Sequence, residues 1–210
     1  MLEAAEIYKA LCQRHTAEKQ EKLKNARVAV AGLGGLGSHV SIALARLGVG
    51  HLRLIDYDVV DITNIFRQCY LLRHIGQYKT DCLKTQIAEI NPYIKVETVT
   101  KKITQENVMD LVGDSDIVCE ALDRKESKAM LINEIMEHCE DKIVVAGSGM
   151  AGTDSANRIV TRKITPRFYV CGDGVSALED GLQLMAPRVA LCAMHEANMI
   201  MRLLLGEPEE

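Results

Sequence analysis

Short apolar runs alternate with longer amphipathic segments along most of this chain, beginning at residue 27. Apolar runs bounded by turn residues predict strands, and apolar positions spaced three and four apart predict helices. The expected strands are 27–31, 51–55, 94–99, 116–120 and 142–146, and the expected helices are 36–47, 78–90, 104–112 and 125–139. Such repetition predicts an α/β, Rossmann-like fold, with a mostly parallel sheet and helices on both faces.

The last third of the chain departs from this alternation after Gly147. Two possible strands, 157–163 and 167–170, predict an antiparallel extension near the C-terminus. Residues 171–181 carry turn signals and few apolar anchors, so we expect a mobile segment there. Pro187 suits the first turn of a last helix, which is apolar almost all round and is therefore expected to be buried.

Composition limits the number of domains and the class of protein. Residues 1–25 are rich in Glu, Lys, Gln and Ala and predict an N-terminal helical appendage, followed by one nucleotide-binding domain over 26–206. The formal net charge of -4 gives no support for a nucleic-acid surface. The sequence shows neither an apolar run of about 18 residues nor a signal-peptide core, so we expect a cytoplasmic protein.

Seven cysteines are scattered singly through the predicted elements, without a Cys-x-x-Cys pair. An odd number in such positions favours reduced thiols over a disulfide framework, and we expect no zinc site.

A glycine-rich turn follows the first strand in Gly32-Leu-Gly34-Gly35-Leu-Gly37-Ser. Gly32 suits a tight turn, Gly34 and Gly35 allow backbone N–H groups to approach phosphate, and Gly37 allows the next helix to lie close to the strand. The amino end of that helix favours an anion. By itself the pattern is weak evidence, and most such loops bind NAD or FAD.

Asp56 ends the second strand about 20 residues beyond the glycine loop, where a carboxylate can bind ribose hydroxyls. The alternative is an exposed aspartate in a turn. For the nearby Asp58 and Asp61, turn or capping roles are the favoured interpretation.

Polar and cationic residues downstream exceed what a dehydrogenase needs. Asn64, Arg67 and Gln68 come first, and Lys79 opens the next helix. The two cations can stabilise the negative charge that develops as pyrophosphate leaves, and Asn64 is a neutral donor. An isolated Arg or Lys is usually a solvated surface charge, but their order after Asp56 favours a phosphate site.

Asp123 follows the strand that ends near residue 120, and so lies at the same sheet edge as the glycine loop. It is the candidate magnesium ligand, because Mg²⁺ takes one or two carboxylates together with substrate phosphates. The alternative role is an N-cap for the helix near residue 125. The glycine loop, Asp56, the two cations and Asp123 together predict an ATP site.

In these motifs the chain resembles the ThiF/MoeB/HesA family of ubiquitin-activating-enzyme-like adenylyltransferases, most closely a short, zinc-less ThiF. The matching features, in order, are Gly32-Leu-Gly-Gly-Leu-Gly-Ser38, Asp56-Tyr-Asp58, Asn64-Ile-Phe-Arg-Gln68, Gly76-Gln-Tyr-Lys79 and Asp123. The resemblance implies MgATP as cosubstrate and a ThiS-like, ubiquitin-fold sulfur carrier protein as partner. The carrier's C-terminal glycine carboxylate would be joined to AMP, with release of pyrophosphate, in thiamine biosynthesis.

The resemblance also implies roles for single residues. The glycine loop would contact phosphate, Asp56 would bind ribose, and Asp123 would hold magnesium. The triphosphate would be surrounded by Asn64, Arg67, Gln68 and Lys79. Arg67, Lys79 and Asp123 are therefore the expected catalytic residues. A homodimer is expected from the family.

Three further positions each have two candidate roles. Arg14 is the nearest match to an arginine that reaches the partner's ATP site in dimeric relatives, but its spacing to the glycine loop is short. Cys171 could be a covalent nucleophile, although a structural strand-end cysteine is favoured. His195, on the apolar last helix, is favoured as a core histidine.

Other functions remain open. A MoeB-like enzyme would activate the carrier of molybdopterin synthase, but the compact length and the missing zinc motif favour ThiF. A tRNA threonylcarbamoyladenosine dehydratase shares the nucleotide motifs, but this chain has no basic C-terminal region. From other classes, the chain could be an NAD-binding oxidoreductase or a non-catalytic carrier-binding protein.

Overall fold

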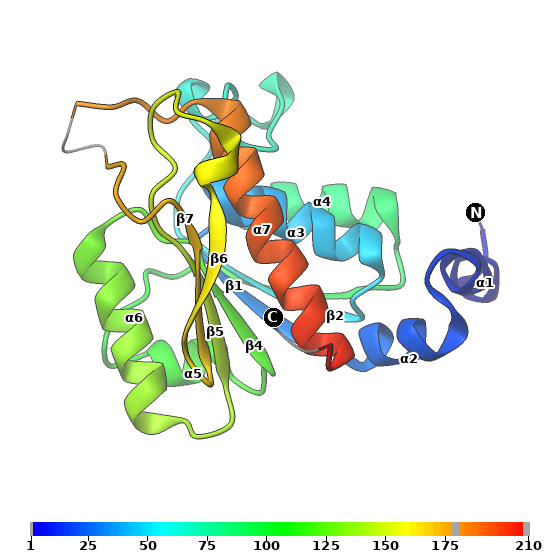
Figure 1. Ribbon diagram of the computed structural model, residues 1–210. Helices are drawn as coiled ribbons and strands as arrows, with labels where there is room; N and C mark the ends of the chain where they lie inside the picture. Colours follow the sequence, from blue (N-terminus) through cyan, green and yellow to red (C-terminus); the bar gives the residue numbers. More distant parts are fainter. Residues whose placement is uncertain (1, 178–180, 208–210) are drawn as a thin grey trace.

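A twisted, seven-stranded sheet forms the centre of the computed structural model, which describes residues 2–177 and 181–207 (Figure 1). The strand order is β3-β2-β1-β4-β5-β7-β6. The strands are β1 (Arg27–Ala31), β2 (His51–Ile55), β3 (Lys95–Val99), β4 (Ile117–Glu120), β5 (Ile143–Gly147), β6 (Val160–Thr165) and β7 (Phe168–Gly172). All neighbours are parallel except β6 and β7, which confirms the mostly parallel sheet with an antiparallel extension.

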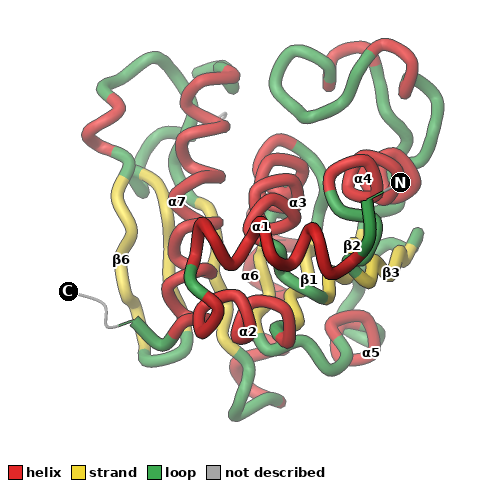
Figure 2. The backbone as a smooth tube through the Cα atoms, turned by 90° about the vertical axis from the view of Figure 1, so that its right-hand side faces the viewer, coloured by secondary structure: helices red, strands yellow, loops and turns green. Residues whose placement is uncertain are grey.

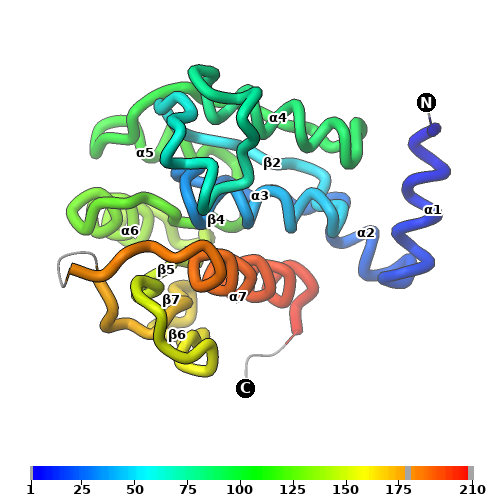
Figure 3. Tube along the Cα trace, turned by 90° about the horizontal axis from the view of Figure 1, so that it is seen from above, coloured from blue at the N-terminus to red at the C-terminus, as the bar shows by residue number. Residues whose placement is uncertain are grey.

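Helices cover both faces of the sheet (Figures 1 and 3). One face carries α3 (Gly35–Leu47), α4 (Lys79–Ile90) and α7 (Ala186–Leu205), and the other carries α5 (Val108–Val112) and α6 (Lys125–His138). Helix α5 begins four residues later than predicted, because residues 105–107 form a turn. Short 3₁₀ turns lie at Ile62–Asn64, Leu72–His74 and Ala156–Arg158.

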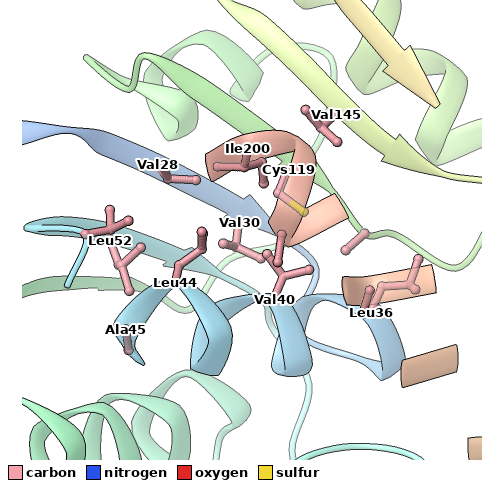
Figure 4. Close-up of a cluster of buried hydrophobic side chains, with 14 of the residues drawn as sticks. Val28, Val30, Leu36, Val40, Leu44, Ala45, Leu52, Cys119, Val145 and Ile200 are labelled. Atoms are coloured by element: carbon pink, nitrogen blue, oxygen red, sulfur yellow. The ribbon is translucent and has the colours of Figure 1, made fainter. Parts of the chain in front are cut away.

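Buried side chains from the strands and from α3 and α7 form the larger of two cores (Figure 4). Val30 of β1 lies between helix residues such as Val40 and Leu44, and all three are fully buried. Burying a side chain of this size stabilises the fold by roughly 1.5–3 kcal/mol. The second core lies between the sheet and the helices α5 and α6.

Strand register brings the ends of three strands to one level. Ala31 pairs with Ile55 of β2 on one side and with Glu120 of β4 on the other. The residues that follow these strand ends therefore emerge side by side at the carboxyl edge of the sheet, where α/β proteins bind ligands. This edge is at the top of Figure 1.

Two helices, α1 (Ala4–His15) and α2 (Ala17–Asn25), precede the sheet and differ in how they pack. Helix α1 has no buried residue and stands apart from the sheet (Figures 1 and 2). Helix α2 buries Gln20 and Leu23, and the amide of Gln20 donates to the carbonyl of Gly48 at the end of α3 (3.2 Å). Over the described residues, no helix is both long and apolar enough to cross a membrane.

Candidate functional site

The glycine loop forms a tight turn between β1 and α3. Gly32 has φ +91°, and a Cβ there would lie 2.6 Å from the carbonyl oxygen of Ala121. A Cβ on Gly37 would collide with the carbonyl oxygen of Gly32, so the close helix–strand approach requires glycine. Above Gly34, by contrast, the nearest atom is Nε2 of Gln68 at 3.8 Å. The loop is therefore closed toward the sheet and open at Gly34, as a phosphate-binding backbone must be.

Asp56 is nearly buried beside this loop. Its carboxylate accepts hydrogen bonds from the backbone N–H groups of Leu33 (2.7 Å) and Asp58 (2.8 Å). Burial raises the pKa of Asp56 above its usual value, although the attraction of Lys79 and the two N–H donors oppose this. Asp56 thus fixes the glycine loop, and each carboxylate oxygen keeps a further lone pair for a ligand hydroxyl.

Lys79 opens α4 and points at two carboxylates. Its Nζ lies 2.7 Å from Oδ2 of Asp58 and 3.9 Å from Oδ2 of Asp56, and the lysine is 6% exposed. The interpretation of Asp58 as a turn residue alone is therefore wrong, because its carboxylate pairs with Lys79. Asp61 does cap a turn, by accepting from the backbone N–H of Thr63 (2.9 Å).

Arg67 and Gln68 border the open side of the glycine loop. Oε1 of Gln68 and Nε of Arg67 are buried and have no hydrogen-bond partner in the described part of the chain. One guanidinium nitrogen of Arg67 donates to the carbonyl of Thr63 (3.0 Å). Asn64 uses its side-chain oxygen to accept from the N–H of Asp61 (3.0 Å), which leaves its amide group to donate elsewhere. Buried polar atoms without a protein partner are rare, and these atoms are available to bind a ligand.

Asp123 lies three residues beyond β4 in a bend, with its side chain exposed. It does not cap α6, whose N-cap position is Arg124. The loop before it packs against Gly32, which places Asp123 at the edge that carries the glycine loop. Across the described ranges, no group of three or more His, Cys, Asp and Glu side chains could hold a metal. One exposed carboxylate nevertheless fits Mg²⁺, if nucleotide phosphates and water supply the other ligands.

A cavity of about 440 Å³ opens beyond the ends of β5 and β7. Its walls include Ala151, Gly152, Val175 and Leu182, together with the polar Thr153, Asp154, Arg158, Asp173 and Ser176. It therefore combines small, apolar and charged walls at the carboxyl edge of the sheet.

Asp173 anchors the segment that forms one wall of this cavity. Its carboxylate accepts from the N–H groups of Val175 and Ser176 and pairs with Arg188 on α7 (2.7 Å). Burial opposes its charge, but these donors outweigh burial and lower the pKa of Asp173. The expectation that 171–181 has few anchors is thus wrong for 171–176, and residues 178–180 lie outside the described residues.

Comparison with known proteins places this architecture in a family. The family model described as "ThiF family" matches residues 8–210. The chain belongs to the ThiF family.

The relatives of this ThiF-family chain carry several names. It is 37% identical over 197 residues to "Adenylyltransferase and sulfurtransferase UBA4" of Scheffersomyces stipitis, which covers 90% of this chain and 44% of that protein. It is 46% identical over 111 residues to the tRNA threonylcarbamoyladenosine dehydratase of Bacillus subtilis, which covers 49% of this chain and 44% of that protein. The chain thus spans less than half the length of these two curated relatives.

The same architecture occurs in a solved structure. The E. coli tRNA N6-threonylcarbamoyladenosine dehydratase TcdA, in complex with ATP, superposes with a TM-score of 0.86 at 22% identity, covering 98% of this chain and 97% of that one. At this identity the likeness shows the fold.

The remaining predicted positions lie away from the open glycine loop. Arg14 is on α1, whose Leu11 contacts Gly48 at the far end of α3, and α3 has 13 residues. This separation is about 20 Å along the helix, so Arg14 does not belong to its own chain's ThiF-family site. Cys171 is fully buried, with Sγ 3.5 Å from Oγ1 of Thr161, and this burial favours the structural role. Nδ1 of the half-buried His195 lies 3.2 Å from the same hydroxyl.

Sequence reasoning missed several residues that support the site. Tyr70 donates to the carbonyl of Leu33 (2.7 Å), and Glu120, Lys128 and Glu196 form a buried charged group beside β4. Two features of the sequence could have indicated buried charges. One is a glutamate that ends an otherwise apolar strand, and the other is a glutamate on an apolar helix. Neither signal identifies the partner, because the partners are distant in the chain.

Proposed function

We propose that this protein is an ATP-dependent adenylyltransferase that activates the C-terminal glycine carboxylate of a ThiS-like sulfur carrier in thiamine biosynthesis. One observation carries the proposal: the open glycine loop is bordered by Arg67 and Gln68, whose buried polar atoms are unpartnered within the described residues. Atoms of this kind fit a polyanionic nucleotide. In the same proposal residues 26–206 form the adenylating domain, residues 1–25 form its helical appendage, and the location is cytoplasmic.

Each residue of the site has a role in this reaction. The glycine loop binds phosphate, Asp56 binds ribose, and Asn64, Arg67, Gln68 and Lys79 surround the triphosphate. Asp123 holds Mg²⁺, which supplies charge neutralisation to the phosphates when it is bound. The carrier's carboxylate is already ionised at neutral pH, so that it needs no general base. Positioning and neutralisation of the departing pyrophosphate supply the acceleration.

The cavity beyond β5 and β7 supports a protein tail as the second substrate. It lies at the carboxyl edge of the sheet, and Val189 at the start of α7 contacts Gly35 of the glycine loop. Ala151 and Gly152 leave room for a narrow Gly-Gly tail, and Arg158 can attract its carboxylate. We assign this cavity to the carrier's C-terminal tail.

The test of adenylation is ATP–pyrophosphate exchange with purified carriers that end in Gly-Gly. We expect exchange with a ThiS-like carrier, and exchange with none of the carriers would contradict the proposal. Arg67→Ala and Asp123→Ala should abolish exchange and leave the circular dichroism spectrum unchanged. Wild-type exchange in either variant would show that the site is misplaced.

The tail assignment has a separate test. Val175 lines the cavity and is 69% exposed, so Val175→Trp narrows the cavity without disturbing the core. We expect the half-saturating carrier concentration in exchange to rise about tenfold or more, with ATP binding unchanged. Ile164→Trp on β6 is the matched control at another exposed apolar position. Equal carrier dependence in both variants would place the tail elsewhere.

A second candidate function is supported by the comparisons. Relatives named as tRNA threonylcarbamoyladenosine dehydratases match the sequence locally, and TcdA matches the fold over nearly the whole chain. The net charge of -4 disfavours a tRNA substrate. Exchange assays with modified tRNA, with ThiS-like carriers and with the carrier protein of molybdopterin synthase separate the three activities, because each is identified by the substrate that supports exchange.

A homodimer is part of the same proposal. The connection between β2 and α4 exposes large apolar side chains, at Tyr57, Val59, Ile62, Phe66, Leu71, Leu72, Ile75 and Tyr78. Apolar patches of this kind mark interaction surfaces. Arg14, which lies far from its own chain's glycine loop, is in this proposal a candidate for the partner's nucleotide site. Phe66→Asp should yield monomers in size-exclusion chromatography with light scattering, and Ile164→Asp should not. If Ile164→Asp yields monomers and Phe66→Asp does not, the interface lies at β6 instead.

A further inference from the structure

Three charged side chains lie beneath the loop that carries Asp123. Glu120 is the last residue of β4 and is fully buried, Lys128 is in the second turn of α6, and Glu196 comes from the middle of α7. We call these three residues the Lys128 cluster. Nζ of Lys128 donates to Oε1 (3.0 Å) and Oε2 (2.8 Å) of Glu120 and to the carbonyl of Leu122 (2.9 Å). All three hydrogens of the ammonium group are therefore used.

The residue before Asp123 is held from both sides by this cluster. The N–H of Leu122 donates to Oε1 of Glu120 (2.8 Å), and its carbonyl accepts from Lys128. The preceding Ala121 packs on Gly32. Helix α6 has no side-chain cap at its N-cap position that would fix the same segment. The direction in which the chain leaves β4, and hence the position of Asp123, depends on the contact between Glu120 and Lys128.

Glu196 is the third member of the cluster and lies near the Lys128–Glu120 pair without a hydrogen bond to it. Both of its carboxylate oxygens are buried and, within the described ranges, lack hydrogen-bond partners. Burial raises the pKa of Glu196 well above its usual value. Burial also acts against the charge of Lys128, but attraction to Glu120 outweighs it and raises the pKa of Lys128. The cluster then holds a hydrogen-bonded Lys128–Glu120 pair beside a carboxyl group that, in the described ranges, has no hydrogen-bond partner.

We propose that Lys128 and Glu120 are positioning residues that place the Asp123 carboxylate for Mg²⁺ bound to the nucleotide. The inference rests on the proposed function, since Asp123 is the magnesium ligand only there. It assigns a positioning role to the buried Glu120 and to its partner Lys128, neither of which touches substrate. Residues that orient a metal ligand typically change metal affinity or activity by about 10- to 100-fold when they are replaced.

The test compares wild type with Lys128→Met and Lys128→Arg. Binding of a fluorescent methylanthraniloyl-ATP is titrated with Mg²⁺, and amide hydrogen exchange is followed over residues 121–124. In Lys128→Met we expect the half-saturating Mg²⁺ concentration to rise about tenfold or more, with faster exchange in this segment. Affinity for the analogue without Mg²⁺ should change less than threefold. Lys128→Arg should restore most of the Mg²⁺ dependence, because its guanidinium group can still donate to both oxygens of Glu120.

Several outcomes distinguish this role from a merely structural one. An unchanged Mg²⁺ half-saturation in folded Lys128→Met would overturn the proposal. If Lys128→Met does not fold, Glu120→Gln, which retains the shape, should still raise the Mg²⁺ requirement, and an unchanged requirement there would equally overturn it. The nucleotide titration needs no carrier. Absence of exchange with every carrier would therefore defeat the adenylation proposal, while the titration would still decide the positioning role.

Discussion

Two groups of one lysine and two carboxylates flank the glycine loop, and they differ in access to solvent. The Lys79 cluster, made of Asp56, Asp58 and Lys79, lies on the β2 side, and the Asp58 side chain is 47% exposed. In the Lys128 cluster on the β4 side, both glutamates are fully buried. The same set of residues, one lysine and two acids, thus serves two purposes. An open cluster can exchange protein partners for a ligand, whereas a sealed cluster fixes the backbone around it.

The difference lies in the carboxylates that the two lysines meet. Lys79 is the first residue of α4, at the carboxyl edge of the sheet, where the connection from β2 leaves Asp58 in contact with water. Lys128 lies one turn into α6, and its partner Glu120 at the end of β4 is fully buried. The exposure of the carboxylate partner therefore distinguishes the two clusters.

The largest effect should come from breaking the sealed cluster. Lys128→Met leaves the buried Glu120 without its counterion, and we expect the free energy of unfolding to fall by about 3 kcal/mol. Urea denaturation measures this change. Lys84→Met, at an exposed position on α4, is the control and should change stability by less than about 0.5 kcal/mol. A similarly small loss in Lys128→Met would show that the sealed cluster is not important for the fold.

Breaking the open cluster should affect the reaction more than the fold. Lys79→Met removes a cation from the triphosphate, and we expect pyrophosphate exchange to fall by roughly 10²- to 10³-fold. Lys84→Met on the same helix should retain wild-type exchange. If Lys79→Met instead exchanges normally but unfolds at lower urea, the two clusters would have the same, structural role.

The pH dependence of stability should separate the clusters further. Glu196 has a pKa raised from its usual value of 4.5, so the folded state keeps a proton that the unfolded chain has lost. Its contribution to stability is greatest below pH 4.5 and declines as the pH rises toward the folded pKa. Glu196→Gln removes this decline. Relative to wild type, its unfolding free energy should therefore grow by up to about 1.4 kcal/mol per pH unit above that value.

Urea denaturation between pH 5 and 8 would measure this slope. The exposed Glu137→Gln on α6, measured over the same pH range, is the matched control for the change from Glu to Gln. Parallel curves for Glu196→Gln and wild type would mean that the buried carboxyl group does not hold a proton.

The smallest effect is expected at the exposed acid of the open cluster. Asp58→Asn removes a partner of Lys79, but Asp56 remains 3.9 Å from the ammonium group. Because the Asp58 side chain is half exposed, we expect a loss of less than about 1 kcal/mol in urea denaturation. A loss as large as that of Lys128→Met would remove the distinction between open and sealed clusters.

Local patterns were sufficient to predict much of this molecule. Apolar runs located the strands, and the glycine loop with its downstream Asp56, Arg67 and Lys79 indicated a site at the carboxyl edge of the sheet. These signals are local because a strand, a turn and a helix start each depend on a few neighbouring residues. The family match confirms the resemblance to the ThiF family that these motifs indicated.

Contacts between distant residues could not be predicted in this way. Glu196 meets the Lys128 cluster only because α7 folds back across β4, and Asp173 finds Arg188 on another element. The frequent glycines in residues 171–176 suggest a mobile loop. In the structure, the ion pair between Asp173 and Arg188 holds this segment in place. Burial and charge pairing across the fold are properties of the assembled molecule.

Two neighbouring residues of α7 face different parts of the site. Arg188 donates to the carbonyls of Asp154 and Ser155 at the cavity, and Val189 lies against Gly35 at the glycine loop. A displacement of this one helical turn must therefore be transmitted to both places. A substitution of either residue is therefore expected to affect both the glycine loop and the cavity. Kinetic studies of such variants should measure nucleotide affinity and acceptor affinity separately.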